Sequence, residues 1–364
     1  MRFLNKIKDL SIVLFSSFLT FAFIEFGYRA LKNNTKVDKF VNRTMLFESG
    51  ENFLNIEGVF KYYPNISIRS LTLYSRKKPK SILDLLFVSE SVISTNNAGL
   101  VMKADLNARD SVLFVIGDSF TEGQGALPWF YSLEKSHEIT NYKLVNLGIL
   151  GTGPVQWNSL SNLITRNFEL DVKGSVINII AGDMNRSQWN FHKRELDCLR
   201  NTKCDYSFGF QGFNFKDHLT ISDIKSSVLA DINKNEKNKK SEIFLLKNFL
   251  KRSQVFEDIY YYFKSPSDSE RIKKNETALV SLRNKVKGNI FINVVSQKGI
   301  NSSNYLNNYL ASQLIKFLND NNFNYKWCNI PLDGFYENDG HPNVKGYKIL
   351  KDCTSNALSK LKQN

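Results

Sequence analysis

The chain has 364 residues, of which 42% are hydrophobic and 23% charged, so its composition is that of a globular protein and excludes a disordered one. This length allows one large domain with an insertion, or two domains. The net charge of +14 favours acidic partners such as anionic lipid headgroups, acidic glycans or nucleic acid.

An apolar segment near the N-terminus, residues 10–28, predicts a membrane span. Its only charge is Glu25, and as a helix it would be about 28 Å long, close to the hydrocarbon thickness of a bilayer. Basic residues precede it as in a signal peptide, but no clear small-residue cleavage site follows. We therefore predict a transmembrane signal anchor at residues 1–29. A buried core helix is the alternative, and it is disfavoured because the segment is apolar on all faces.

Basic residues also follow the span, so the positive-inside rule gives only a preference for its orientation. We prefer a single-pass topology with the N-terminus in the cytoplasm and the remainder outside, in the periplasm. Residues 30–110 mix polar loops with short apolar runs and are interpreted as a membrane-proximal lead-in without identifiable chemistry.

From residue 111 onwards, apolar runs alternate with segments of helical spacing. Such runs are typical of strands buried on both faces of a parallel sheet. The sequence therefore predicts an α/β domain over residues 111–364, whose ligands gather at the carboxyl ends of the strands. The predicted strands lie at 111–116, 143–147, 175–180, 289–295 and 325–330, and the predicted helices at 156–168, 304–318 and 347–361.

A basic, aromatic-containing segment at about 186–287 interrupts this alternation and predicts an insertion, either a cap over the substrate or a surface elaboration. The four cysteines form two sequence-local pairs, Cys198 with Cys204 and Cys328 with Cys353. Two disulfides in an oxidising compartment and four reduced thiols are equally compatible with this count.

A serine follows the first buried run directly, in the sequence Gly117-Asp-Ser-Phe-Thr-Glu-Gly123. Ser119 therefore stands at the sheet edge in a glycine-flanked turn. Taken alone, Gly-Asp-Ser is a common tripeptide, and a helix N-cap is then the better interpretation of Ser119. The chain has only four histidines, and one of them, His341, lies in the turn Asp339-Gly-His-Pro. A serine needs a base, and an imidazole serves best when a carboxylate orients it, so Ser119, His341 and Asp339 can supply these three roles.

Together these segments resemble the SGNH (GDSL-type) hydrolase family over residues 110–355, apart from the insertion. The segment from Gly117 resembles the nucleophile block, the turn at His341 resembles the acid–histidine block, and Val145-Asn-Leu-Gly-Ile-Leu-Gly-Thr-Gly153 is similar to the block whose glycine N–H helps to form the oxyanion hole. Gly151 is the position that we align with that glycine, and Gly148 is the second choice. The resemblance implies a three-layer α/β/α flavodoxin-like fold and ester or acyl-transfer chemistry.

The chain departs from the family pattern at two positions. The family commonly places its acid three residues before the histidine, where this chain has Asn338, so Asp339 is expected to orient His341 with Asp333 in reserve. The asparagine that donates to the oxyanion in the family aligns with Gly182. Losing one such donor costs about 3 to 4 kcal/mol of transition-state stabilisation. Asn185 is a possible replacement, beside the N–H groups of Ser119 and Gly151.

A metal site made by Asp118, Asp183, Asp339 and His341 is the alternative arrangement, but the spacing matches no recognised metal signature. We expect no cofactor and no metal. The sequence thus predicts a membrane-anchored serine esterase or O-acyltransferase that acts on an ester of an envelope glycan or lipid. The most specific form of this prediction is an O-acetyl ester. The alternative is a catalytically reduced module that binds an envelope polysaccharide. Nucleic acid binding has no supporting motif.

Overall fold

The computed structural model describes residues 20, 42–48, 53–56, 59–76, 79–126, 128–136, 142–186, 212–215, 219–240 and 268–361. The predicted membrane span at residues 10–28 lies outside these ranges except for Thr20. Within the ranges, no helix is both long enough and apolar enough to cross a bilayer. Cys198 and Cys204 also lie outside them.

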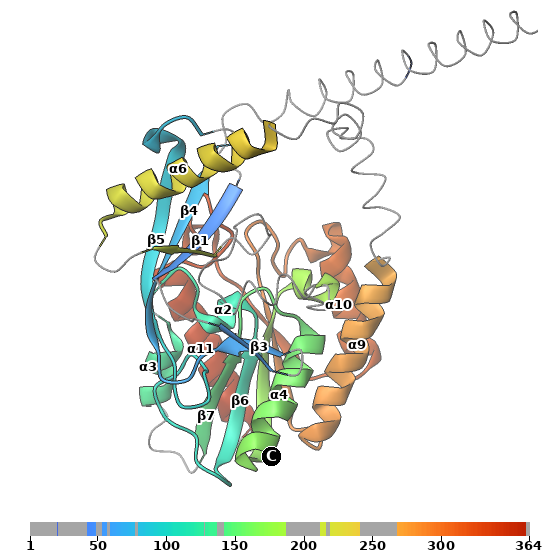
Figure 1. Cartoon of the computed structure of the whole chain (residues 1–364). Helices are drawn as coiled ribbons and strands as arrows, with labels where there is room; N and C mark the ends of the chain where they lie inside the picture. Colours follow the sequence, from blue (N-terminus) through green and yellow to red (C-terminus); the bar gives the residue numbers. More distant parts are fainter. Residues whose placement is uncertain are drawn as a thin grey trace, which may run out of the picture.

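A five-stranded parallel sheet forms the centre of the molecule (Figure 1). Its strand order is β7-β6-β8-β10-β11, the order of a flavodoxin-like doubly wound fold. β6, β7, β8 and β10 coincide with apolar runs and β11 with the short candidate at 325–330, which confirms the predicted strands and the α/β class. The bounds are β6 Ser111–Gly117, β7 Lys143–Gly148, β8 Asp171–Ile179, β10 Ile290–Val295 and β11 Tyr325–Cys328.

Helices cover both faces of this sheet, so the expected three layers are present (Figure 1). Helix α4 packs against α9 on one face, and α11 lies on the other face against β8 and β10. Helix α9 falls inside the range predicted as an insertion, yet it belongs to the helical layer beside α4. The helices are α2 Ser119–Glu122, α3 Phe130–Ser136, α4 Pro154–Phe168, α9 Asp268–Lys285, α10 Tyr309–Asp320 and α11 Val344–Leu361, with 3-10 turns η2 Ala181–Asn185, η3 Tyr305–Asn307 and η4 Leu332–Gly334.

A second, mostly antiparallel sheet precedes the α/β part in the chain. Its order is β5-β4-β1-β9, and β9 comes from the insertion and pairs with β1 in parallel. Leu46, Leu71 and Leu85 of this sheet form a separate apolar cluster with Ile224 and Val228 of α6. The bounds are β1 Asn42–Glu48, β4 Ser67–Ser75, β5 Leu85–Ser94, β9 Gly212–Phe215 and α6 Ile221–Lys240, with the hairpin β2 Phe53–Ile56 and β3 Val59–Tyr62 and the turn η1 Ile82–Asp84.

This second sheet gives structure to the segment interpreted as a lead-in. The β2–β3 hairpin of the same segment contacts the nucleophile region directly, because the Tyr62 hydroxyl of β3 donates a hydrogen bond to Glu122 on α2. The Tyr131 hydroxyl of α3 also joins the two parts, since it donates to the carbonyl of Ser94 over 2.7 Å and accepts from its N–H over 2.8 Å. The segment before residue 111 therefore packs onto the α/β part beside the expected site.

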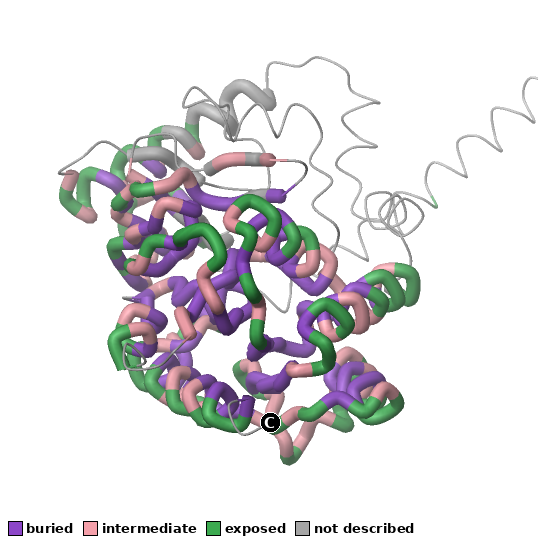
Figure 2. Tube along the Cα trace, turned by 90° about the horizontal axis from the view of Figure 1, so that it is seen from below, coloured by how far each residue is buried: buried purple, intermediate pink, exposed green. Residues whose placement is uncertain are grey.

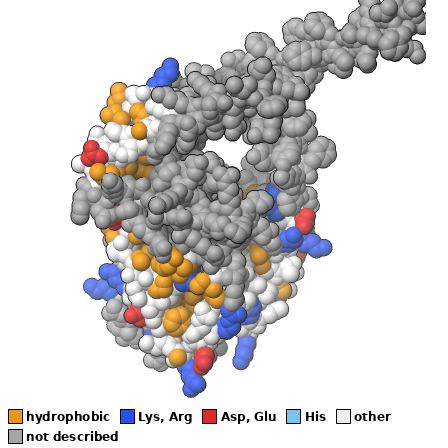
Figure 3. Space-filling model, in the orientation of Figure 1, with side chains coloured by type: hydrophobic (Ala, Val, Ile, Leu, Met, Phe, Trp, Pro, Cys, Tyr) orange, Lys and Arg blue, Asp and Glu red, His pale blue; other side chains and the backbone are white. Residues whose placement is uncertain are grey.

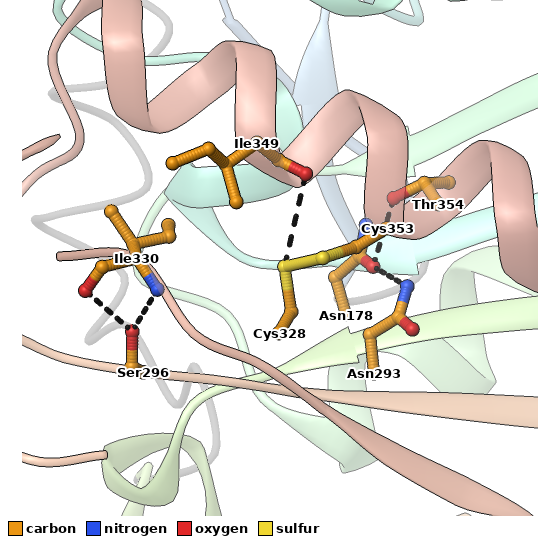
Figure 4. Close-up of a disulfide and its surroundings, with 8 residues drawn as sticks. All are labelled: Asn178, Asn293, Ser296, Cys328, Ile330, Ile349, Cys353 and Thr354. Atoms are coloured by element: carbon orange, nitrogen blue, oxygen red, sulfur yellow. Dashed lines mark hydrogen bonds between the residues drawn. A yellow bond between two sulfur atoms is a disulfide. The ribbon is translucent and has the colours of Figure 1, made fainter. Parts of the chain in front are cut away.

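Buried residues concentrate in the strands, and the outer sides of the helices are exposed (Figure 2). A disulfide between Cys328 and Cys353 connects the edge strand β11 to α11 (Figure 4). Nearby, Asn178 of β8 accepts hydrogen bonds from Asn293 of β10 over 2.8 Å and from Thr354 of α11 over 3.2 Å. Of the two pairs considered from the sequence, this one is thus oxidised.

Candidate active site

The serine predicted as nucleophile stands where β6 ends and α2 begins. Asp118 caps the helix, because its Oδ1 accepts a hydrogen bond from the N–H of Phe120 over 2.9 Å. Gly148, at the end of the neighbouring strand β7, packs so closely that a Cβ there would lie 2.4 Å from the Glu122 nitrogen. Only glycine fits this position, and the contact holds the turn at the carboxyl edge of the sheet. Ser119 is 4% exposed.

The predicted histidine lies in a short loop just before α11. The loop is closed by a bridge between Phe335 and Pro342 and by a hydrogen bond from the Tyr336 N–H to the His341 carbonyl over 3.1 Å. Asn343 then caps α11, since its Oδ1 accepts from two backbone N–H groups of the first turn at 2.9 and 3.2 Å. The helix thereby fixes the end of the loop against the sheet.

The structure brings the three predicted side chains together. Ser119 Oγ lies 2.9 Å from His341 Nε2, and His341 Nδ1 lies 2.5 Å from Asp339 Oδ1. The same carboxylate oxygen accepts the backbone N–H of His341 over 3.1 Å. Asp339 is 4% exposed, and the Phe120 ring lies 5.4 Å from the imidazole, centre to centre. A hydroxyl, an imidazole and a buried carboxylate that are hydrogen-bonded in this order are able to generate an alkoxide nucleophile.

Asp333, the reserve candidate for the acid, lies elsewhere. Its side chain is 67% exposed and forms an ion pair with Lys345, with 2.5 Å between Oδ2 and Nζ. The two-residue spacing works because Asp339 and His341 share one tight turn, in which the carboxylate reaches both the ring and the backbone of the histidine.

Two of the carboxylates considered as metal ligands, Asp118 and Asp183, instead contact an arginine. Arg186 Nη2 lies 3.4 Å from Asp118 Oδ2, and its Nε lies 3.5 Å from Asp183 Oδ1. Burial and the negative charge of Asp118 raise the pKa of Asp183 well above its ordinary value, while Arg186 acts in the opposite direction. The arginine therefore joins the nucleophile turn to the end of β8.

The residues predicted to donate to the oxyanion differ in their hydrogen bonds and backbone conformation. The N–H of Gly148 donates to Asn146 Oδ1 over 2.8 Å, which commits it to the strand end. Gly151 lies in the loop between β7 and α4 with a φ of 67°, a left-handed conformation that favours glycine. The Asn185 Oδ1 accepts a hydrogen bond from Arg271 Nε of α9 over 2.8 Å. No contact that the structure shows joins Asn185 to Ser119, so its role and that of Gly151 stay predictions.

Sequence reasoning missed two groups that border the site. Arg186 follows Asp183 by three residues, a helix-turn spacing that could have indicated the ion pair. Tyr347 of α11 donates from its hydroxyl to the Gln124 carbonyl over 2.6 Å and so holds the segment after α2. Burial, followed by the charges of Asp118 and other acids, raises the pKa of this tyrosine well above its ordinary value.

Comparison with known proteins gives distant structural matches alone, since no family model and no curated protein matches the chain. A GDSL-like lipase from Bacteroides thetaiotaomicron is 13% identical, with 69% of this chain and 88% of that chain covered and a TM-score of 0.31. A psychrotrophic esterase from Pseudoalteromonas sp. is also 13% identical, with 70% and 100% covered and a TM-score of 0.35. An acetylxylan esterase from Geobacillus stearothermophilus, in a catalytic mutant form, is 11% identical, with 70% and 95% covered and a TM-score of 0.34. At such TM-scores the functional assignment rests on the side-chain geometry of the site.

Proposed function

We propose that this protein is an SGNH-type serine esterase or O-acyltransferase, with Ser119 as nucleophile, His341 as general base and Asp339 as the group that orients the base. The observation that carries the proposal is the continuous hydrogen-bonded line from Ser119 Oγ through the imidazole to the buried carboxylate. The three groups come from two segments 222 residues apart, and both lie at the carboxyl edge of the parallel sheet, where such folds bind ligands.

The geometry supports acyl transfer in two steps. As Ser119 Oγ attacks the carbonyl carbon of the ester, its proton moves to His341 Nε2, and the negative charge of Asp339 stabilises the imidazolium. The carbonyl electrons move to the oxygen, and the tetrahedral intermediate then collapses as His341 returns the proton to the departing alcohol. Water or an acceptor hydroxyl next repeats the sequence on the acyl-enzyme and releases Ser119.

The proposed substrate is an O-acetyl ester of an envelope glycan or lipid outside the cytoplasmic membrane. The predicted N-terminal span would anchor the enzyme to that membrane. The disulfide between Cys328 and Cys353 supports an oxidising compartment such as the periplasm. The net charge of +14 supports an acidic polymer or membrane surface as partner. Basic side chains lie at several places around the described part of the face seen in Figure 3.

Turnover of p-nitrophenyl acetate by the full chain tests the proposed activity. We expect Ser119→Ala to abolish it, because no other group takes the place of Oγ in the line to His341 Nε2. Ser159→Ala is the matched control, since this serine is exposed on α4 and should leave the rate unchanged. Equal rates in the wild type and in Ser119→Ala would refute the proposal.

The second candidate function is a catalytically reduced module that binds an envelope polysaccharide, and the glycine at position 182 favours it. Labelling with a fluorophosphonate separates the two candidates, because the reagent forms a covalent bond only with an activated serine. Labelling that disappears in Ser119→Ala supports the enzyme. An unlabelled protein that retains polysaccharide supports the binding module.

A further inference from the structure

A glutamine at the end of β10 has a backbone held rigidly at the same sheet edge as the triad. Gln297 and Ile300 exchange two backbone hydrogen bonds of 2.9 Å each, which closes a tight turn directly after the strand. The preceding residue, Ser296, is held as well, since its Oγ accepts the Ile330 N–H over 2.7 Å (Figure 4). The position from which the Gln297 side chain projects is therefore well defined.

The amide of this glutamine occupies the space beside Gly182. A Cβ placed on Gly182 would lie 3.6 Å from Gln297 Nε2, an ordinary contact distance, and apart from Gly182 and its two chain neighbours no other polar atom of the described residues lies within 4 Å of it. Within the described part of the chain, the side-chain amide makes no hydrogen bond. Two N–H donors thus lie against a residue that has no side chain of its own, and they are available to a ligand.

The neighbours of Gln297 and of Gly182 contact the two segments that carry the proposed triad. The next residue, Lys298, donates from Nζ to the Tyr336 carbonyl over 3.0 Å and also to the Glu337 carbonyl, at the start of the loop that carries His341. On the other side, Gly182 is followed by Asp183, whose partner Arg186 also binds Asp118 beside the nucleophile.

We propose that the Gln297 side-chain amide donates a hydrogen bond to the oxyanion that forms on the substrate, and so is a catalytic residue. This inference rests on the proposed function. When Ser119 Oγ bonds to the acyl carbon, the carbonyl oxygen gains a full negative charge, which a preorganised N–H group stabilises more in the tetrahedral state than in the ester. The oxyanion needs donors that the protein does not use elsewhere. The Gly148 N–H is already committed to Asn146, whereas no described residue accepts a hydrogen bond from the Gln297 amide.

Removing the amide tests this role. We expect Gln297→Ala to lower kcat for p-nitrophenyl acetate by about 100- to 1000-fold with little change in KM, the effect of losing one oxyanion donor. Gln297→Glu should be at least as slow, because a carboxylate repels the developing charge. Gln313→Ala on α10 is the matched control and should keep the wild-type rate. Thermal unfolding of each variant shows whether the fold is retained.

A second-site substitution provides a readout that a merely structural role would not move. The φ of Gly182 lies outside the left-handed region, so a side chain is tolerated there. Gly182→Asn therefore places an amide in the same space from the turn η2. We expect Gly182→Asn to restore at least ten-fold of kcat in Gln297→Ala. The inference would be overturned if the wild type is active and the kcat of Gln297→Ala lies within three-fold of it. It would also be overturned if Gln297→Ala is slow and Gly182→Asn does not restore its kcat. An inactive, unlabelled wild type would instead overturn the proposed function.

Discussion

Replacing Asp339 by Asn removes one negative charge beside the imidazole and leaves the shape of the site unchanged. In the native protein, one carboxylate oxygen accepts both His341 Nδ1 and the His341 backbone N–H. An amide oxygen can keep both bonds, so the ring should retain its orientation and tautomer. What the variant loses is the attraction between a carboxylate and the imidazolium that forms in the transition state.

The magnitude follows from this geometry. With the charge centres about 4 Å apart and an effective dielectric constant of about 20, the attraction is about 4 kcal/mol, a factor of about 1000 in rate. We expect kcat and kcat/KM to fall together by this factor, because the interaction exists only once the imidazole is charged.

Steady-state turnover of p-nitrophenyl acetate measures the loss, with Asp333→Asn as the matched control. Asp333 is exposed and paired with Lys345, so its variant should keep the wild-type rate. A loss below ten-fold in Asp339→Asn, or an equal loss in Asp333→Asn, would refute the assignment of Asp339 as the orienting acid.

Three further predictions concern stability. Arg186→Met leaves the buried Asp118 carboxylate without its cation and Asp183 without its arginine partner. We expect a loss of about 3 kcal/mol, the low end for such pairs because the arginine side chain is 36% exposed. Because the pKa of Asp183 is raised, the native state holds a proton that the unfolded chain releases near pH 4. The free energy of unfolding should therefore decrease as the pH rises above about 4. In Asp183→Asn this decrease should be smaller. Cys353→Ser opens a disulfide with a sequence separation of 25 from Cys328 and should cost about 3.5 kcal/mol in urea unfolding.

Each of these predictions has a contrasting outcome. Arg109→Met, at an exposed ion pair with Glu169, should change the free energy of unfolding by less than about 1 kcal/mol, and an equal loss would remove the special role of Arg186. Urea titrations at several pH values that give parallel curves for the wild type and Asp183→Asn contradict the assignment of the titration. For the disulfide, an unchanged urea midpoint in Cys353→Ser argues that the bond does not restrain the unfolded chain.

The sequence predicted the central sheet well because β6, β7, β8 and β10 are buried along most of their length, whereas the edge strand β11 is only partly buried. Buried strands read as continuous apolar runs, and each run recurs as a strand of the parallel sheet. The second sheet was not predictable in this way, since β1 pairs with β9 and the two segments lie far apart in the sequence. Helix α9 was missed because its apolar residues are few and its charged residues many.

The candidate site, like the fold, contains residues that the sequence predicted and residues that it did not. Ser119, Asp339 and His341 were predicted because each stands in a short motif whose residues lie side by side in the chain. Arg186 and Gln297 belong to no motif, and only the folded backbone brings them to the sheet edge. The candidate acid two residues before the histidine contacts it, since a tight turn lets the Asp339 carboxylate reach both the ring and the backbone N–H of His341.

The hydrogen bond from Tyr62 to Glu122 limits how far the protein can be shortened. A version that begins at β6 would contain every residue of the proposed triad, yet the buried Glu122, three residues after the nucleophile, would lose its phenolic donor from the β2–β3 hairpin. The segment that follows β8 cannot be excised without consequence either, because it supplies β9, which pairs with β1 in the sheet β5-β4-β1-β9. The smallest active unit should therefore extend from β1 to α11, and the two sheets should be treated as one unit when the protein is engineered or fused.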